Sequence, residues 1–522
     1  MDPVALSVFA SRVASVCDEM GAVLRRTAFS PNIRDRLDYS CALFDAHGRL
    51  VAQAANIPVH LGSMAYAMQQ VVTGHTLDDG DVLVFNDPFL GGTHLPDVTL
   101  VAPVHVDGVC VGYAANRAHH ADIGAVTPGS MPLSSRLEEE GVRIPPRKLR
   151  DRGVPCEAVL REITGATRNP EQAAGDFAAQ ASSVALGVER LAARVRGRGR
   201  GDYVGSVDAL NANARRLVEE RLRRLPAGTY RFTDVLDDDG QGTTDIPIHV
   251  AITVADGRVL ADFTGTADQV PGNVNCPMPV TAAATHYVFR CLMPPQTPAC
   301  AGAFAPIELH APAGSLVNAR EPAAVAAGNV ETSQRIVDVV SGALGQAAPE
   351  HAAAASQGTM NNLAMGAAEG AHSGAWDYYE TLAGGAGAGP AGAGRSAVHT
   401  HMTNTLNTPI EALEMAYPLR VTRYAVRRGS GGEGVHPGGE GVARCYRILD
   451  ATEATWITER RRHAPWGLAG GGAGAPGAVL LNGVAMPGKE RRLLRAGDTL
   501  EVLTPGGGAW GEAALAPEDH QQ

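Results

Sequence analysis

Hydrophobic side chains recur every three or four positions at the start of the chain, which predicts a helix with one buried face. These positions run from Leu6 to Val23, and Asp2 and Pro3 before them suit a helix cap and the first helical residue. Four later segments are also expected to be helical, namely 171–196, 206–225, 279–293 and 332–347.

Short segments rich in β-forming residues and bounded by Gly, Asp or Pro predict strands. The clearest are 39–44, 82–86, 98–106, 109–115, 419–427, 443–449, 477–481 and 498–503. Alternation across 229–265, with a turn at Asp256-Gly257, predicts a further hairpin. Prolines exclude a helix from 129–150. Because no regular βαβ repeat appears, we expect an α+β (mixed) fold of several layers.

Four regions follow from this order of elements. We expect an N-terminal α/β region over 1–150, a helical region over 151–228, a central α+β region over 229–415 and a β-rich region over 416–522. Within the central region, 383–394 reads AGGAGAGPAGAG. Such a segment is either a flexible surface loop or a close-packed crossing of backbones.

Composition excludes several classes of protein. The 522 residues carry a net charge of −11 and no basic stripe, so nucleic acid is not an expected partner. No apolar stretch approaches the ~20 residues that span a bilayer. The Met1-Asp2-Pro3 start lacks the features of a secretory signal, and the eight cysteines form no CxxC pair. We therefore expect a cytoplasmic protein with reduced thiols and no membrane contact.

Two polar loops at the ends of one predicted hairpin carry the sharpest chemical signal. His94 and Asp97 precede strand 98–106, and His119 follows strand 109–115, so the hairpin brings them together. Two imidazoles and one carboxylate suit Mn²⁺, Fe²⁺ or Zn²⁺ and can acidify a bound water. His120 and Asp122 are neighbouring groups or substitute ligands. The alternative is that all of these are capping and turn residues.

A second polar cluster, VHTHMTNTLNTPIE, covers 398–411. His399 and His401 alternate, so a strand here would point both the same way. Asn404 and Glu411 follow within reach, and amide side chains suit a lactam or ureide substrate. The histidines are alternatively half of a second metal site, or part of a buried polar network that ties a loop down.

Other polar clusters predict only tight turns, and some motifs are missing. His60, the run 329–332 and the run 357–362 fit Asx or Gly-rich turns. Neither lysine, Lys148 or Lys489, lies in a GxxxxGK[ST] motif, and no GxSxG elbow occurs. If ATP is consumed, another chain is expected to bind it.

Nine blocks of sequence, in order along the chain, resemble the hydantoinase B/5-oxoprolinase family, which includes N-methylhydantoinase B-type subunits. They are SPNIRDRLDYSCALFD (30–45), IPVHLGSM (57–64), NDPFLGGTHLPD (86–97), RAHHADIG (117–124), EEGVRIPPRKL (139–149), AAGNVETSQRIVDVV (326–340), SQGTMNN (356–362), HTHMTNTLNTPIEALE (399–414) and APWGLAGG (464–471). Ala125 departs from the family pattern, where a further Gly is usual, and the loop at 383–394 looks reduced.

The resemblance implies the hydrolase-side B subunit of an ATP-dependent cyclic amidase. Its partner would be a hydantoinase A-type ATPase subunit, in an A₂B₂-type hetero-oligomer. ATP handled by that partner would activate the oxygen of hydantoin, 5-oxoproline or another lactam, and ring opening would follow on this chain.

The resemblance also assigns residues. Related acetone and acetophenone carboxylases hold a metal with a His-x-x-Asp and a later His, which corresponds here to His94, Asp97 and His119. The other expected site residues are His60, His120 and Asp122 for catalysis and His399, His401, Asn404 and Glu411 for substrate binding. Two alternatives remain open at this point, the alpha subunit of an ATP-dependent carboxylase and a non-catalytic scaffold for the ATPase.

Overall fold

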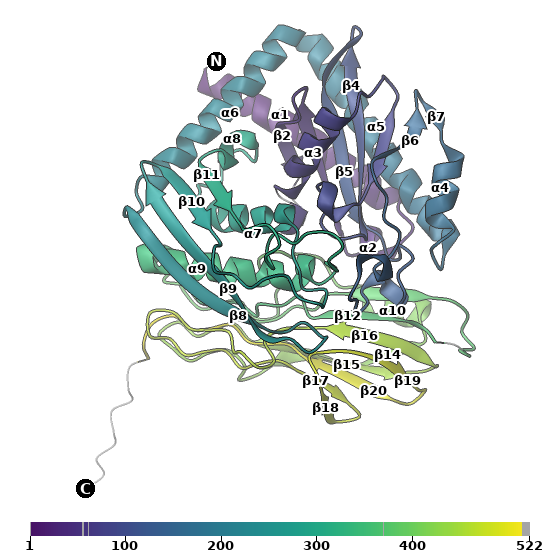
Figure 1. The fold of residues 1–522 in the computed structure, drawn as a ribbon, viewed down its shortest axis with the longest axis vertical. Coiled ribbons are helices and arrows are strands. Elements are labelled where there is room, and N and C mark those ends of the chain that lie inside the picture. The colour runs from purple at the N-terminus through teal and green to yellow at the C-terminus, as the bar shows by residue number, and fades with distance from the viewer. Residues whose placement is uncertain (1, 55–56, 61, 369, 514–522) are drawn as a thin grey trace.

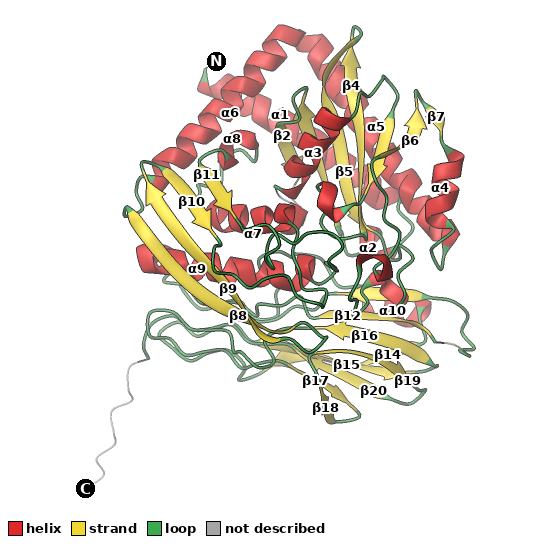
Figure 2. Cartoon of the chain, viewed as in Figure 1, coloured by secondary structure: helices red, strands yellow, loops and turns green. Residues whose placement is uncertain are grey.

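The computed structural model describes residues 2–54, 57–60, 62–368 and 370–513, and its elements form an α+β fold as expected (Figures 1 and 2). The C-terminal end of the predicted β-rich region, 514–522, lies outside the described residues. The helices are α1 (Pro3–Thr27), α2 (Pro31–Arg34), α3 (Ser63–Gly74), α4 (Glu157–Thr164), α5 (Pro170–Arg198), α6 (Arg200–Leu222), α7 (Met278–Cys291), α8 (Ala301–Phe304), α9 (Ser333–Ala347) and α10 (Ile410–Ala416). Among them, none is both long and apolar enough to cross a bilayer.

The first sheet is antiparallel and contains the predicted hairpin. Its order is β2 (Leu50–Ala54), β1 (Tyr39–Asp45), β5 (Val109–His119), β4 (Asp97–Val106), β3 (Val82–Phe85), β6 (Arg147–Asp151) and β7 (Val154–Pro155). Helices α1 and α5 pack on one face and α3 on the other. Leu43 therefore joins one core and Phe44 the other. Because both faces are covered, β1 is buried throughout and reads as a continuous apolar run.

The second sheet curves around α9. It runs β11 (Ile307–His310), β10 (Arg258–Asp262), β9 (Thr244–Ala255) and β8 (Gly228–Asp238). The long strands β8 and β9 bend over α9, which packs on α7 (Figure 1). The turn at Asp256-Gly257 joins β9 to β10, as the alternation predicts. Apolar side chains of this sheet belong to the same core as α1 and α5, so the first two-thirds of the chain share one interior.

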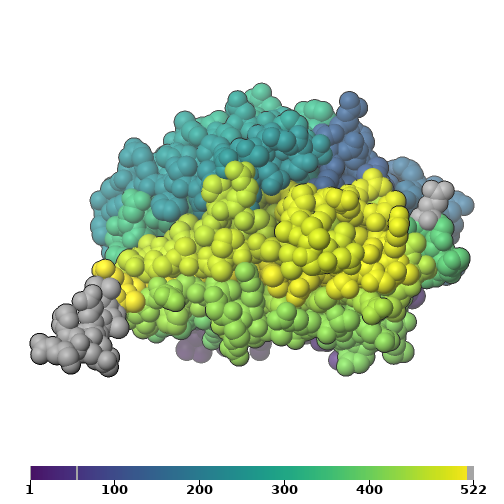
Figure 3. All heavy atoms as spheres, turned by 90° about the horizontal axis from the view of Figure 1, so that it is seen from below, coloured from purple at the N-terminus to yellow at the C-terminus, as the bar shows by residue number. Residues whose placement is uncertain are grey.

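Two further sheets form the lower layer in Figure 1 and much of the face seen in Figure 3. One runs β13 (Asp377–Glu380), β12 (Asn362–Ala367), β16 (Thr452–Ile457) and β19 (Lys489–Leu494). The other runs β14 (Leu419–Arg427), β15 (Gly441–Ile448), β20 (Thr499–Leu503), β17 (Ala478–Leu481) and β18 (Val484–Met486). Because β12 pairs with β16, the first of them joins the predicted regions 229–415 and 416–522.

The glycine-rich segment 383–394 is a close-packed backbone crossing, which decides between the two expectations for it. Its peptide groups bond to other glycine-rich segments, with Gly385 N donating to Pro505 O and Gly439 N donating to Ala386 O. A Cβ on Gly385 would lie 2.0 Å from Gly439 O. Only glycine permits backbones to approach this closely, so the composition here serves packing.

Gly387 and Gly389 provide a matched test of that packing. A Cβ on Gly387 would lie 1.9 Å from Ala354 O, whereas a Cβ on Gly389 would meet nothing nearer than 3.8 Å. We expect Gly387→Ala to lower the free energy of unfolding by about 2 kcal/mol or more, and Gly389→Ala to change it by less than about 0.5 kcal/mol. Urea unfolding of both variants measures the difference. Equal stability of the two variants would contradict the close packing.

His286 on α7 generates a prediction about acid stability. Its ring is buried, stacks on Phe304 with centroids 4.6 Å apart, and burial lowers the pKa of the imidazole to about 4. The unfolded chain takes up this proton below pH ~6.5, so the free energy of unfolding falls as pH drops from there toward 4.

Removing that titration should flatten the pH dependence. Between pH 7.5 and pH 5, we expect His286→Leu to lose about 2 kcal/mol less stability than the wild type. Urea unfolding at the two pH values measures this difference. The exposed His47 offers a control, and His47→Leu should follow the wild-type profile. A wild-type profile for His286→Leu would refute the assignment.

Candidate metal centre

The hairpin of β4 and β5 places the predicted triad as the sequence indicates. Asp97 is the first residue of β4, His119 is the last of β5, and the two are directly paired across the ladder. His94 lies three residues before Asp97, on the loop that leads into β4. One ligating atom from each of the three side chains lies within 4.8 Å of the others. All three residues are buried, at no more than 3% exposure.

The two oxygens of the Asp97 carboxylate have different surroundings. Oδ2 accepts a hydrogen bond from Thr93 Oγ1 at 2.6 Å and lies 3.3 Å from His60 Nε2. Oδ1 faces the other two histidines, 3.2 Å from His94 Nε2 and 3.1 Å from His119 Nδ1. One oxygen is thus held by the protein, while the other lies between two imidazole nitrogens.

Hydrogen bonds on the far side of the rings orient His94 and His60. His94 Nδ1 lies 3.2 Å from Ala326 O, which can only accept, so Nδ1 carries a proton. His94 Nε2 then offers a lone pair unless the ring is charged, and Asn329 Nδ2 lies 3.0 Å from it. His60 Nδ1 contacts Ser40 Oγ at 3.1 Å. Backbone or hydroxyl partners that fix a ring in this way are typical of metal-binding histidines.

Burial and nearby charge compete at each of these groups. Burial opposes ionisation of Asp97, but the nearby charges of His94 and His60 and the hydrogen bond from His119 outweigh it and hold the pKa well below its usual range. Burial also opposes charging of His94, yet Asp97 raises the pKa of that ring. For His119, burial prevails and lowers the pKa. The centre is therefore a buried carboxylate that attracts positive charge.

The donor set fits a divalent cation. An imidazole lone pair that faces a carboxylate oxygen at 3.2 Å is repulsive unless a proton or a cation lies between them. His119 Nε2 is also buried and has no hydrogen-bond partner within the described part of the chain. Two imidazoles with one carboxylate are a ligand set suited to Mn²⁺, Fe²⁺ or Zn²⁺.

A cavity of about 20 Å³ adjoins the triad. That is roughly the room one water needs. Asp38, Asn329 and Tyr379 line it, and Tyr379 stacks on the His119 ring with centroids 4.9 Å apart. The site therefore combines residues from the first sheet, from the turn before α9 and from β13.

The predicted neighbours His120 and Asp122 are not brought to this cavity. His120 Nε2 bonds to Gln180 Oε1 at 2.9 Å and its ring packs on Phe177. Asp122 accepts hydrogen bonds from the backbone of Arg168 at 2.6 Å and from Ser130 Oγ at 2.9 Å. Successive side chains of a strand point to opposite faces. His120 directly follows His119 at the end of β5, so its side chain points away from the side that His119 faces.

The expectation that His399 and His401 alternate on a strand is wrong. His401 has a φ of +56° and belongs to a turn, so His399 and His401 do not share a face. Neither ring lines the triad cavity, while Asn404 and Glu411 are exposed.

The same segment nonetheless reaches the cavity through side chains with weaker sequence signals. Met402, Thr403 and Thr405 line it. These residue types carry no metal-ligand or acid–base signature, so spacing alone does not single them out.

Asn329 is the site residue whose role the sequence least revealed. The run 328–332 forms a π-helical turn (Gly328–Thr332) that leads into α9, and the expected tight turn is wrong. Such wide turns occur preferentially at functional sites. Asn329 Oδ1 is buried and finds no partner among the described residues. Only the juxtaposition with His94, 235 positions away in sequence, makes this amide conspicuous.

Comparison with known proteins agrees with this architecture. The chain is 38% identical to 5-oxoprolinase 1 of Arabidopsis thaliana over 98% of its own length, and it spans 42% of that longer protein. It is 29% identical to the B subunit of a Pseudomonas enzyme named "Putative D-/L-hydantoinase", covering 98% of this chain and 90% of the relative. The crystal structure of the ATP-dependent caprolactamase from Pseudomonas jessenii superposes with a TM-score of 0.89 at 27% identity, covering 99% and 92% of the two chains.

The family model described as hydantoinase B/oxoprolinase matches residues 2–513. That match includes the β4–β5 hairpin, the turn before α9 and the glycine-rich C-terminal segments. The chain therefore belongs to the hydantoinase B/oxoprolinase family.

Proposed function

We propose that this chain is the hydrolytic B subunit of an ATP-dependent enzyme that opens a small cyclic amide. The observation that carries the proposal is the buried centre itself, in which His94, Asp97 and His119 converge beside the amide oxygen of Asn329, which has no hydrogen-bond partner among the described residues. The names of the relatives, two of which refer to oxoproline or caprolactam hydrolysis, support the same substrate class.

His94, Asp97 and His119 would hold a divalent Mn, Fe or Zn ion. When bound, such an ion supplies Lewis acidity, which polarises a carbonyl and lowers the pKa of water. The protein's own groups prepare the site for that role. Thr93 fixes one oxygen of Asp97, so the other keeps its direction toward the two imidazoles. A rigid arrangement of this kind avoids reorganisation during the reaction.

His60 and Asn329 are the residues that we assign to the substrate. His60 Nε2, 3.3 Å from Asp97 Oδ2, is placed to hold or release a proton at the edge of the cavity. Asn329 Oδ1 is a buried acceptor without a partner among the described residues, and the N–H of a lactam is the matching donor. Both side chains line the cavity, unlike His120 and Asp122.

The cavity beside the triad must widen before a ring can enter. About 20 Å³ accommodates one water but not a lactam. Met360 and Met402 line it together with the polar groups. Methionine side chains adapt readily to new shapes, so we assign the widening to rotation of these two.

ATP is assigned to a separate A-type subunit, with an A₂B₂-type hetero-oligomer as the proposed assembly. An amide is kinetically inert, and phosphorylation of its oxygen by the partner creates a leaving group. The carboxylase alternative is not favoured, because the solved structure at 27% identity is a lactam-cleaving enzyme by name. Dependence of turnover on bicarbonate would reverse that preference.

Metal content tests the centre directly. In the chain co-purified with its ATPase partner, elemental analysis should find about one Mn, Fe or Zn per chain, and His94→Ala should lose it because one ligand of three is removed. His120→Gln is the matched control and should retain the metal, since His120 bonds to Gln180 instead. Metal-free protein that still opens a lactam with ATP and the partner would refute the assignment.

Asn329 and Asn404 provide a pair of variants that test substrate recognition. We expect Asn329→Ala to lower kcat/KM for ATP-coupled ring opening of 5-oxoproline or hydantoin by about 10- to 100-fold, the cost of one lost buried hydrogen bond. Metal content should be unchanged. Asn404→Ala, on the surface, should leave kcat/KM at the wild-type value. The opposite ranking of the two variants would move substrate binding to the 398–411 segment.

A further inference from the structure

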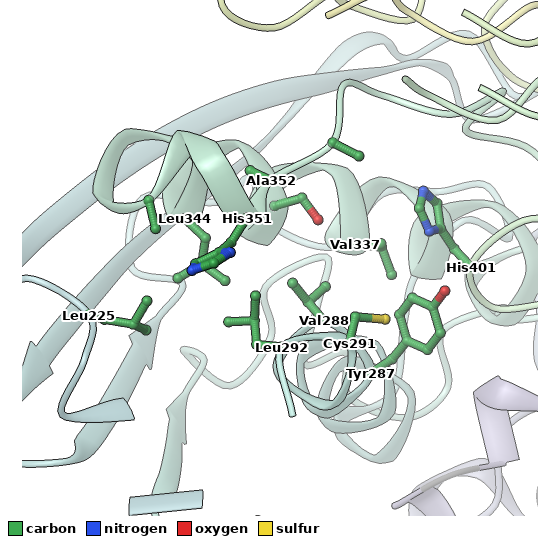
Figure 4. Close-up of a pocket in the computed structure, with 13 residues that line it drawn as sticks. Leu225, Tyr287, Val288, Cys291, Leu292, Val337, Leu344, His351, Ala352 and His401 are labelled. Atoms are coloured by element: carbon green, nitrogen blue, oxygen red, sulfur yellow. The ribbon is translucent and has the colours of Figure 1, made fainter. Parts of the chain in front are cut away.

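A second cavity lies between α7 and α9, and it shares no lining residue with the triad cavity. Its volume is about 160 Å³. Figure 4 shows Leu225, Val288, Leu292, Val337 and Leu344 around it. These side chains come from α7 and the residue after it, from α9 and from the segment after α6, and they make most of the wall apolar, although Ser341 and His351 also line it.

One end of this cavity is polar. His401 and Tyr287 meet there with ring centroids 5.8 Å apart, in an edge-to-face arrangement (Figure 4). His401 Nε2 lies 4.0 Å from Asp338 Oδ1, which is too long for a hydrogen bond. That carboxylate oxygen is buried and has no hydrogen-bond partner among the described side chains and backbone. Hydrogen-bonding capacity therefore remains unused at this end.

The polar end lies directly behind the wall of the triad cavity. His401 lines the apolar cavity, and the next two residues, Met402 and Thr403, line the triad cavity. The positive φ of His401 turns the chain at this point, which separates the direction of its ring from that of the residues after it. One short turn is thus in contact with both cavities.

We propose that the cavity between α7 and α9 binds a neutral small molecule that has an apolar ring or short chain and one hydrogen-bonding end directed at His401. An apolar cavity of similar volume accepts benzene, so about six to nine non-hydrogen atoms fit. Charge on the ligand is unfavourable because the mostly apolar walls would remove its water, and an anion would also face the buried Asp338 carboxylate beside His401. Both a cyclic amide and a separate effector have this chemistry.

Cys291 makes binding measurable on the full-length chain. It lines the cavity and is an exposed free thiol, whereas Cys110 and Cys156 are half-buried thiols outside the cavity. We expect benzyl alcohol to protect Cys291 from iodoacetamide in a saturable manner, while the two reference cysteines keep their rates. Benzoate, the same ring with a charge, should protect at least about tenfold less. Peptide mass spectrometry after timed alkylation gives the three rates.

Filling the cavity should abolish protection. Ser341 is a half-buried lining residue on α9, so Ser341→Phe places a ring in the space with little disturbance of the core. We expect it to weaken benzyl alcohol binding at least about tenfold. Gln346→Phe adds the same ring on the exposed side of that helix and should bind as the wild type does. Unchanged protection in Ser341→Phe, or none in the wild type, would overturn the proposal.

His401→Phe tests the polar end separately. The variant keeps an aromatic ring but loses the hydrogen-bonding nitrogens, so toluene should protect Cys291 as it does in the wild type. The preference for benzyl alcohol over toluene should fall about tenfold. A preference that survives in His401→Phe would overturn the role of this end.

Two further experiments identify the source of the ligand and distinguish failure of this proposal from failure of the proposed catalytic function. A seven-membered lactam that protects Cys291 at the concentration that half-saturates turnover marks the ligand as the substrate. Protection only far above that concentration marks a separate effector of the same chemistry. His94→Ala should bind benzyl alcohol as the wild type does, because the triad does not line this cavity. Loss of the metal and loss of this site are therefore distinguishable.

Discussion

The Asp97 carboxylate is the constraint around which the rest of the structure is organised. A carboxylate at 1% exposure is stable only if positive charge and hydrogen-bond donors replace the lost water. The loop before β4 supplies Thr93 and His94, the end of β5 supplies His119, and the 3-10 turn Pro58–His60 supplies a third imidazole. These elements must therefore meet at one point, which the β4–β5 ladder and the turn before α9 achieve.

A buried network of ion pairs and hydrogen bonds fixes the positions of the site residues that come from distant parts of the chain. Arg335 on α9 contacts Glu459, which also binds Lys489 at 2.6 Å, so α9 is tied to the C-terminal sheets. Glu331, on the same turn as Asn329, accepts a hydrogen bond from Asn362, and Asn362 in turn accepts one from Tyr379, which stacks on His119. Burial, with the nearby charge of Glu459, raises the pKa of Glu331 to about 8, so near neutral pH this carboxyl is largely protonated and accepts the hydrogen bond from Asn362 as a neutral group. Removing one member of such a network leaves others unpaired, which makes it cooperative.

The local parts of this arrangement were predictable from sequence, while the distant parts were not. The hairpin brings Asp97 and His119 together within about 25 consecutive residues, and a two-residue turn and alternation predict this approximately, but their direct pairing depends on a one-residue register shift between Val104 and His105. Helices such as α5 and α9 follow from apolar spacing. Asn329, by contrast, reaches His94 through packing of α9 under a curved sheet, which no local pattern encodes. The strand expected at His399 fails for a related reason, since tertiary contacts of the turn at His401 override the alternation.

The two cavities show why the 399–405 turn resists a simple interpretation from sequence. Its histidines attract attention as ligands, yet the triad is complete without them, and His401 faces an apolar space between two helices. A turn with a positive φ at His401 lets Met402 and Thr403 both line one cavity while His401 lines the other, whereas a strand would point Met402 and Thr403 to opposite faces. A molecule held against His401 and a ring held beside Met402 would then press on opposite sides of the same short backbone. Occupancy of one cavity would then act on the shape of the other through this backbone, without displacing His94, Asp97 or His119.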